Sequence, residues 1–146
     1  MHKYLYPNVP GQTRIYNHTF EVPINPNQNE FKLEEKSAIE HERILGVWVA
    51  SPGGTGINGS SMISQAVFDA AYISLREDET IVAKNIPLRR IKQCNDNGLP
   101  FFVDMNKVDM VESSIKIGGI NDIADADLSD RVIQFTFDFI KLSKRK

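Results

Sequence analysis

Residues 131–140 carry the clearest hydrophobic pattern in this chain. Within this run Phe135, Phe137 and Phe139 occupy alternate positions, and Gln134, Thr136 and Asp138 stand beside or between them. A period of two is expected for a β-strand that buries one face and exposes the other. The run therefore predicts a strand whose three phenylalanines lie in a hydrophobic core.

A second run, residues 43–50, is more continuously apolar, contains Trp48 and is stopped by the turn residues 51–54. We expect it to be a core strand, with Trp48 in the core. Shorter runs of strand character occupy residues 31–33, 71–76, 80–83, 101–103 and 114–117. The runs at 71–76 and 80–83 flank an acidic turn and predict a hairpin. About seven short strands at this spacing favour an antiparallel sandwich or barrel.

Helix is expected to be minor. Only residues 60–69 and 86–92 have a composition that allows a helical turn or two. The fold class predicted from these patterns is all-β: an antiparallel, jelly-roll-like β-sandwich with at most short helices.

The first thirty residues differ from the rest of the chain. Their prolines forbid a helix of useful length, because each fixes its own φ and pushes its predecessor toward extended geometry. Their aromatic side chains favour burial, either on the same domain or on a neighbour. We therefore predict an extended N-terminal arm over residues 1–30 and a β-sandwich domain over residues 31–146. The aromatic residues expected at an interface are Tyr4, Tyr6, Tyr16 and Phe20.

Composition limits the class of protein. Of the 146 residues 41% are hydrophobic and 25% are charged, which is ordinary globular usage for one domain. A formal net charge of -2 argues against a nucleic-acid footprint over the whole chain. The single cysteine, Cys94, excludes an intrachain disulfide and a four-cysteine metal site. Without a signal-peptide pattern or a long apolar stretch, the expected location is the cytoplasm or a particle assembled there.

The glycine-rich stretch at residues 54–59 matches GxGxxG, and Glu77 follows about twenty residues later. Such glycines let a dinucleotide pyrophosphate approach a helix N-terminus. The further strand and helix units of that fold are missing, so a loop joining two strands is the preferred interpretation. Since Ser60 and not lysine follows Gly59, a phosphate-binding P-loop is excluded. No cofactor is expected.

Other candidate chemistry is sparse. The acidic stretch at 121–130 offers carboxylates that suit Ca²⁺, although its spacing is not that of an EF-hand, and a solvated loop is preferred. The candidate ligands are Asp122, Asp125, Asp127 and Asp130. The three histidines are scattered, the serines lack a GxSxG elbow, and Cys94 is interpreted as an inert thiol. We accordingly expect no catalytic residue and no enzymatic activity.

Two basic groups remain. Arg89, Arg90 and Lys92 are clustered, and a basic tip of Lys144, Arg145 and Lys146 ends the sequence. A basic tip can contact nucleic-acid phosphates or lipid headgroups, whereas an ordinary solubilising terminus is the preferred interpretation.

Three stretches carry a resemblance to a known class of proteins. They are the aromatic, proline-bearing arm, the run ERILGVWVA with the later AAYISLREDETIVAKNIPLRRI, and the closing strand RVIQFTFDFIKL. In this layout the chain resembles the jelly-roll capsid, penton and minor virion proteins of icosahedral, tailless bacteriophages. The resemblance covers most of the chain as layout, without a diagnostic motif. A thirty-residue arm leaves only short strands for a full eight-stranded roll.

The resemblance implies a structural virion protein that acts by contacts with itself and with other shell proteins and that binds no small-molecule substrate. Two alternatives stay open. A β-sandwich module that binds carbohydrate or another ligand would need exposed aromatic residues besides Trp48. A small enzyme would need a pocket with convergent polar groups, which the sequence alone does not reveal.

Overall fold

A computed structural model describes the chain in six stretches. They are residues 6–7, 9–10, 13–33, 39–77, 80–119 and 122–142. Tyr4, the residue pair 78–79 and the basic tip at 144–146 lie outside them.

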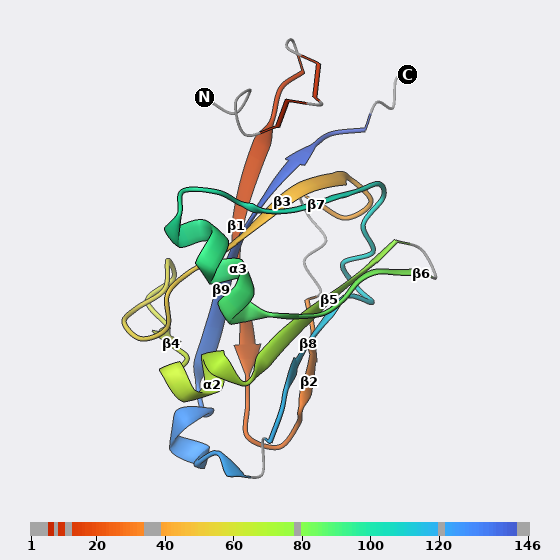
Figure 1. Ribbon diagram of the computed structural model, residues 1–146. Helices are drawn as coiled ribbons and strands as arrows, with labels where there is room; N and C mark the ends of the chain where they lie inside the picture. The colour runs from red at the N-terminus through yellow and green to blue at the C-terminus, as the bar shows by residue number, and fades with distance from the viewer. Residues whose placement is uncertain are drawn as a thin grey trace.

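The strands of the described residues form two β-sheets (Figure 1). Sheet A contains, in spatial order, β1 (Tyr16–Ile24), β9 (Arg131–Ile140), β3 (Arg43–Val49) and β7 (Phe101–Met105). The short β4 (Ser61–Met62) adds a parallel pairing to the start of β9, on residues that β3 does not reach. Sheet B contains, in spatial order, β2 (Glu30–Lys32), β8 (Ser114–Ile117), β5 (Ala71–Glu77) and β6 (Thr80–Pro87). Every pairing except that of β4 with β9 is antiparallel.

The strand order is that of a jelly roll. When β4 is left out, the eight remaining strands follow the order 1-8-3-6 in sheet A and 2-7-4-5 in sheet B. Consecutive strands cross between the sheets, except β5 and β6, which form a hairpin within sheet B; this is the arrangement of two interleaved Greek keys. The predicted all-β sandwich is confirmed, as is the hairpin of β5 and β6.

The core between the sheets follows the predicted alternation. Phe135 and Phe137 of β9 are fully buried, and Phe139 is 3% exposed. Ile73 of β5 and Ile115 of β8 face them from sheet B and are also buried in the same cluster. The prediction for Trp48 is wrong. This residue is half-buried and lies outside the core cluster, because it follows the opposite alternation to its buried neighbours in β3.

The described residues form two short α-helices, one within the predicted segment 60–69 and one that begins in the predicted segment 86–92 and continues beyond it, and both lie on one side of the sandwich in Figure 1. Helix α2 spans Gln65–Asp69, and the side chain of Ser64 caps it by accepting a hydrogen bond from the Val67 amide. Helix α3 spans Leu88–Asp96 and buries Leu88 and Ile91. Among the described residues, no helix is long and apolar enough to cross a bilayer.

The structure corrects the boundary that the sequence predicts between the arm and the sandwich. Residues 16–24 form β1, which pairs with β9 over nine residues, and Glu30 begins β2. Pro23 did not prevent this, because β1 lies at the edge of sheet A, where a missing N–H breaks no ladder on the open side. The sandwich therefore includes residues assigned to the arm, which explains how the chain completes a full eight-stranded roll.

Candidate interaction surface

A buried carboxylate organises the outer face of sheet A, the face turned away from sheet B. Asp138 lies on β9 between two core phenylalanines, points to the outer face and is only 2% exposed. Its Oδ2 accepts a 2.6 Å hydrogen bond from the Tyr6 hydroxyl and a 2.8 Å hydrogen bond from Nε1 of Trp48. Such donors are required because burial removes the water that hydrates the carboxylate, and hydrogen bonds from the protein must replace that water.

Tyr6 belongs to the residues before β1 and is 5% exposed. Burial raises the pKa of its phenol well above the ordinary value, and the hydrogen bond to Asp138 and the negative charge there act in the same direction. The phenol therefore remains a proton donor to Asp138. It holds the N-terminal segment against the outer face of the sheet.

Gly46 on β3 makes this contact possible. A β-carbon at that position would lie 2.2 Å from the Tyr6 hydroxyl oxygen and 2.8 Å from Cβ of Pro100. The pairing of β3 with both its neighbours also shifts register between Ile44 and Gly46, as at a β-bulge. The glycine is thus needed for close approach and not for an unusual backbone angle.

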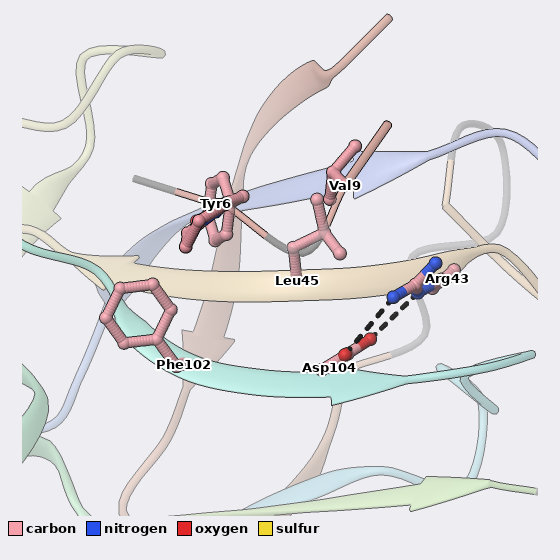
Figure 2. Close-up of a pocket in the computed structure, with 7 residues that line it drawn as sticks. Tyr6, Val9, Arg43, Leu45, Phe102 and Asp104 are labelled. Carbon is pink, nitrogen blue, oxygen red and sulfur yellow. Dashed lines mark hydrogen bonds and ion pairs between the residues drawn. The ribbon is translucent and has the colours of Figure 1, made fainter. Parts of the chain in front are cut away.

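Beside Tyr6 the outer face forms a hollow of about 300 Å³. Its lining residues are Tyr6, Pro7, Val9, Arg43, Leu45, Phe102 and Asp104. Figure 2 shows the two aromatic rings at one end and the ion pair at the other, with Val9 and Leu45 between them. The Tyr6 ring meets the Phe102 ring edge-on at 5.6 Å, and Phe102 stays 52% exposed on the edge strand β7.

The polar end of the hollow is a bidentate ion pair between Arg43 and Asp104. Nε of Arg43 lies 2.8 Å from Oδ1 of Asp104, and Nη2 of Arg43 lies 3.2 Å from Oδ2. This hydrogen bonding raises the pKa of the Arg43 guanidinium, against the opposing effect of burial. None of the described lining residues is a Ser, Cys or His. The hollow combines an apolar wall with a fixed charge pair, a combination suited to recognition of another surface.

The glycine-rich loop folds onto the same outer face, near β1 and β9. The Ile57 amide donates to the Gln134 side chain at 2.9 Å, and the Asn58 amide donates to the Glu21 carboxylate at 3.2 Å. These backbone donors, which a phosphate would need, are therefore engaged by the chain itself. The element after the loop is β4 and not a helix, and Glu77 lies on sheet B. This geometry is that of a connecting loop.

The aromatic residues predicted at an interface are accommodated within the chain where they are described. Phe20 is buried in the core against Phe135 and Phe137. Tyr16 stacks on Phe139 at 5.6 Å. Tyr6 is anchored to Asp138 and is 5% exposed where it lines the hollow.

The acidic loop does not gather its carboxylates. Asp125 and Asp127 lie in a 3₁₀ helix (Asp125–Asp127), and the carbonyl of Asp125 accepts the amides of Leu128 and Ser129. In the part of the chain that the structure describes, no three His, Cys, Asp or Glu side chains form a group that could hold a metal ion. The suggested Ca²⁺ site at Asp122, Asp125, Asp127 and Asp130 is therefore not assembled.

The basic residues are divided. Arg89, Arg90 and Lys92 lie on α3, where Lys92 forms an ion pair with Asp96 one turn later. Lys144, Arg145 and Lys146 lie outside the described residues. Cys94 is half-buried on α3 and is unpaired.

Sequence reasoning missed Asp138 and Gly46. Asp138 occupies a polar position of an alternating strand, which indicates exposure, and nothing local shows that Tyr6 covers it.

Comparisons with models of protein families, with curated proteins and with solved structures gave no significant match.

Proposed function

We propose that this chain is a structural subunit that acts through protein–protein contacts and has no enzymatic role. In its most specific form, it is a capsid, penton or minor capsid protein, assembled in the cytoplasm of a host and located in the virion. Its partners would then be copies of itself and other shell proteins.

The strand order supports this proposal as an analogy. Viral capsid proteins use the jelly roll, and so do lectins and cupins, so the fold alone does not select a function. Tyr6 adds to the analogy, because it precedes the sandwich in the sequence and is tethered to the outer face of sheet A by its hydrogen bond to Asp138. A segment outside the sandwich that is held in place can present a defined surface to a neighbour.

The observation that carries the proposal is the hollow beside Phe102. Phe102 is 52% exposed and lies next to an apolar hollow. A partner that covers this apolar surface removes it from water, which lowers the free energy of the complex. Phe102 also lies on β7, whose outer backbone edge offers hydrogen-bonding groups to an added strand. The Arg43–Asp104 pair at the far end supplies polar specificity at the rim.

The test is the mass of the purified protein by light scattering, for the full chain and for Phe102→Asp. We expect the full chain to form a defined oligomer and Phe102→Asp to shift it toward monomer. Ile57→Asp is the matched control, since Ile57 is 58% exposed on the glycine-rich loop. It should leave the oligomer intact.

A truncation gives a second readout. It must end before Tyr16, because β1 begins there, and deletion of residues 1–15 should weaken the oligomer while circular dichroism still reports β-structure. Electron microscopy of the concentrated protein tests for closed shells. A full chain that stays monomeric at high concentration, and copurifies with no partner, contradicts the proposal.

A further inference from the structure

A second concave site lies on the other sheet, away from the hollow. On the outer face of sheet B a groove of about 450 Å³ crosses β8, β5 and β6. Its lining residues are Asn29, Tyr72, Asn85, Lys116, Ile117 and Gly118. The volume is in the range of small-molecule sites.

The apolar part of the groove is the ring of Tyr72. This residue lies on β5 between Ala71 and Ile73, which are buried in the core, so its own side chain points outward and is 36% exposed. Gly118 keeps space open beside the ring. A β-carbon at that position would lie 3.8 Å from Cε1 of Tyr72, so a larger side chain there would extend over the ring.

The polar part of the groove is formed by the side chains of Asn85, Asn29 and Lys116. Asn85 has a positive φ of 52° and is held by Ser74, whose hydroxyl accepts from the Asn85 amide at 2.8 Å and lies 3.3 Å from Asn85 Oδ1. This contact orients the side chain and leaves its NH₂ group available. In the described part of the chain, the side chains of Asn29 and Lys116 make no hydrogen bond or ion pair.

Lys116 is the only charged residue in this lining, and its register partner on β2 is Glu30, whose carboxylate accepts a hydrogen bond from the Ser114 hydroxyl. An aromatic ring beside amide groups suits a pyranose ring, which has an apolar face and a rim of hydroxyl groups. A carboxylate on that sugar would form a charge-assisted hydrogen bond with the ammonium group of Lys116.

We propose that this groove binds an acidic saccharide, with the sugar ring on Tyr72 and its carboxylate at Lys116. The asparagine side chains hold the hydroxyl groups. This activity goes beyond the proposed structural role, and it does not depend on that role because it uses the other sheet.

Calorimetric titration of the full chain tests the proposal, with D-glucuronate and N-acetylneuraminate as acidic probes and D-glucose as the neutral counterpart. At least one acidic sugar should bind with a dissociation constant below roughly 10 mM. It should bind about fivefold more tightly than glucose, the size expected for one partly exposed ion pair. Added salt should reduce that difference.

Four variants locate the site. Tyr72→Ala and Gly118→Leu should abolish binding, the first by removing the ring and the second by filling the groove. Lys116→Met should reduce the affinity for the acidic sugar to the affinity that the parent chain has for glucose. Lys84→Met is the matched control, because Lys84 is exposed on β6 outside the lining, and it should bind like the parent chain.

Three results would overturn the proposal. In the first, neither acidic sugar binds at roughly 10 mM. In the second, glucose binds as tightly as the acidic sugars. In the third, binding of the acidic sugar survives both Tyr72→Ala and Gly118→Leu. The oligomeric mass enters none of these measurements, so the proposed structural role can fail independently.

Discussion

The hydroxyl of Tyr6 donates a 2.6 Å hydrogen bond to Asp138, which lies 132 positions later in the chain. This contact joins the segment before the sandwich to the strand at the middle of sheet A. It also shows that an aspartate on the outer face of a sheet can be as buried as a core residue when a neighbouring segment covers it.

Removing the phenol should destabilise the fold. We expect Tyr6→Phe to lower the free energy of unfolding by on the order of 1–3 kcal/mol, because Asp138 then loses one of its two donors while remaining buried. Urea denaturation measures this. Tyr16→Phe is the matched control, since the Tyr16 hydroxyl makes no hydrogen bond in the described part of the chain. A similar loss in both variants would contradict the role given to Asp138.

The same contact predicts a pH dependence at the alkaline end. The pKa of Tyr6 is raised in the folded state, so above about pH 10 the unfolded chain releases a proton that the folded chain keeps. The free energy of unfolding should therefore be fully maintained below that pH. It should fall above it, by up to roughly 1.4 kcal/mol per pH unit. The stability difference between the parent chain and Tyr6→Phe should shrink in that window, and a constant difference up to about pH 11.5 would show that Tyr6 does not titrate as inferred.

Gly46 should not tolerate even a methyl group. Gly46→Ala places a β-carbon against Tyr6 and Pro100, and we expect a loss of about 1–3 kcal/mol from overpacking. Gly118→Ala is the control, because the nearest atom to a β-carbon there is the Ala70 carbonyl oxygen at 3.6 Å. Thermal unfolding distinguishes them: equal midpoints would show that the outer face adapts to a side chain at position 46.

The core is predicted to depend on the phenylalanines of β9. Phe137→Ala should cost about 3–5 kcal/mol, since Phe137 is fully buried and packs edge-on against Phe20 at 5.1 Å. The exposed Phe102→Ala, measured in parallel at a concentration where the protein is monomeric, should change stability by less than about 1 kcal/mol. Comparable losses would mean that burial is not what stabilises β9.

The glycine-rich loop should loosen when Glu21 is removed. Glu21 accepts hydrogen bonds from both the amide and the side chain of Asn58. Hydrogen exchange at Asn58 should therefore accelerate in Glu21→Ala. Glu112→Ala, which removes an exposed partner of Lys32 on sheet B, should leave that amide unchanged. Titration with NAD or ATP should give no saturable binding in either variant or in the parent chain.

Much of the fold could be predicted because its strands are locally patterned. The alternation over residues 131–140 directly indicates a strand with one buried face, and the turn residues between the runs at 71–76 and 80–83 indicate a hairpin. The pattern fails for Trp48, because an aromatic residue in an apolar run indicates burial without indicating on which face. It fails again for β1, where Pro23 argues against an interior strand but is compatible with an edge strand.

The candidate surface was less predictable. Tyr6 was expected at an interface because it is aromatic in a proline-rich segment, yet its partner Asp138 is separated from it by nearly the whole sequence. No local pattern relates the two residues.

The requirement for a glycine at position 46 is likewise set by atoms of Tyr6 and Pro100, which only the folded chain brings together.

The position of β9 has a consequence for how the protein is made. This strand lies between β1 and β3 in sheet A, although it follows every other strand in the sequence. During synthesis on the ribosome, β1 and β3 therefore emerge long before the strand that joins them. Most of the pairing in sheet A links distant parts of the chain, which favours slow folding. A ribosome stalled before residue 131 holds a nascent chain whose core residue Phe20 has no phenylalanine of β9 to pack against.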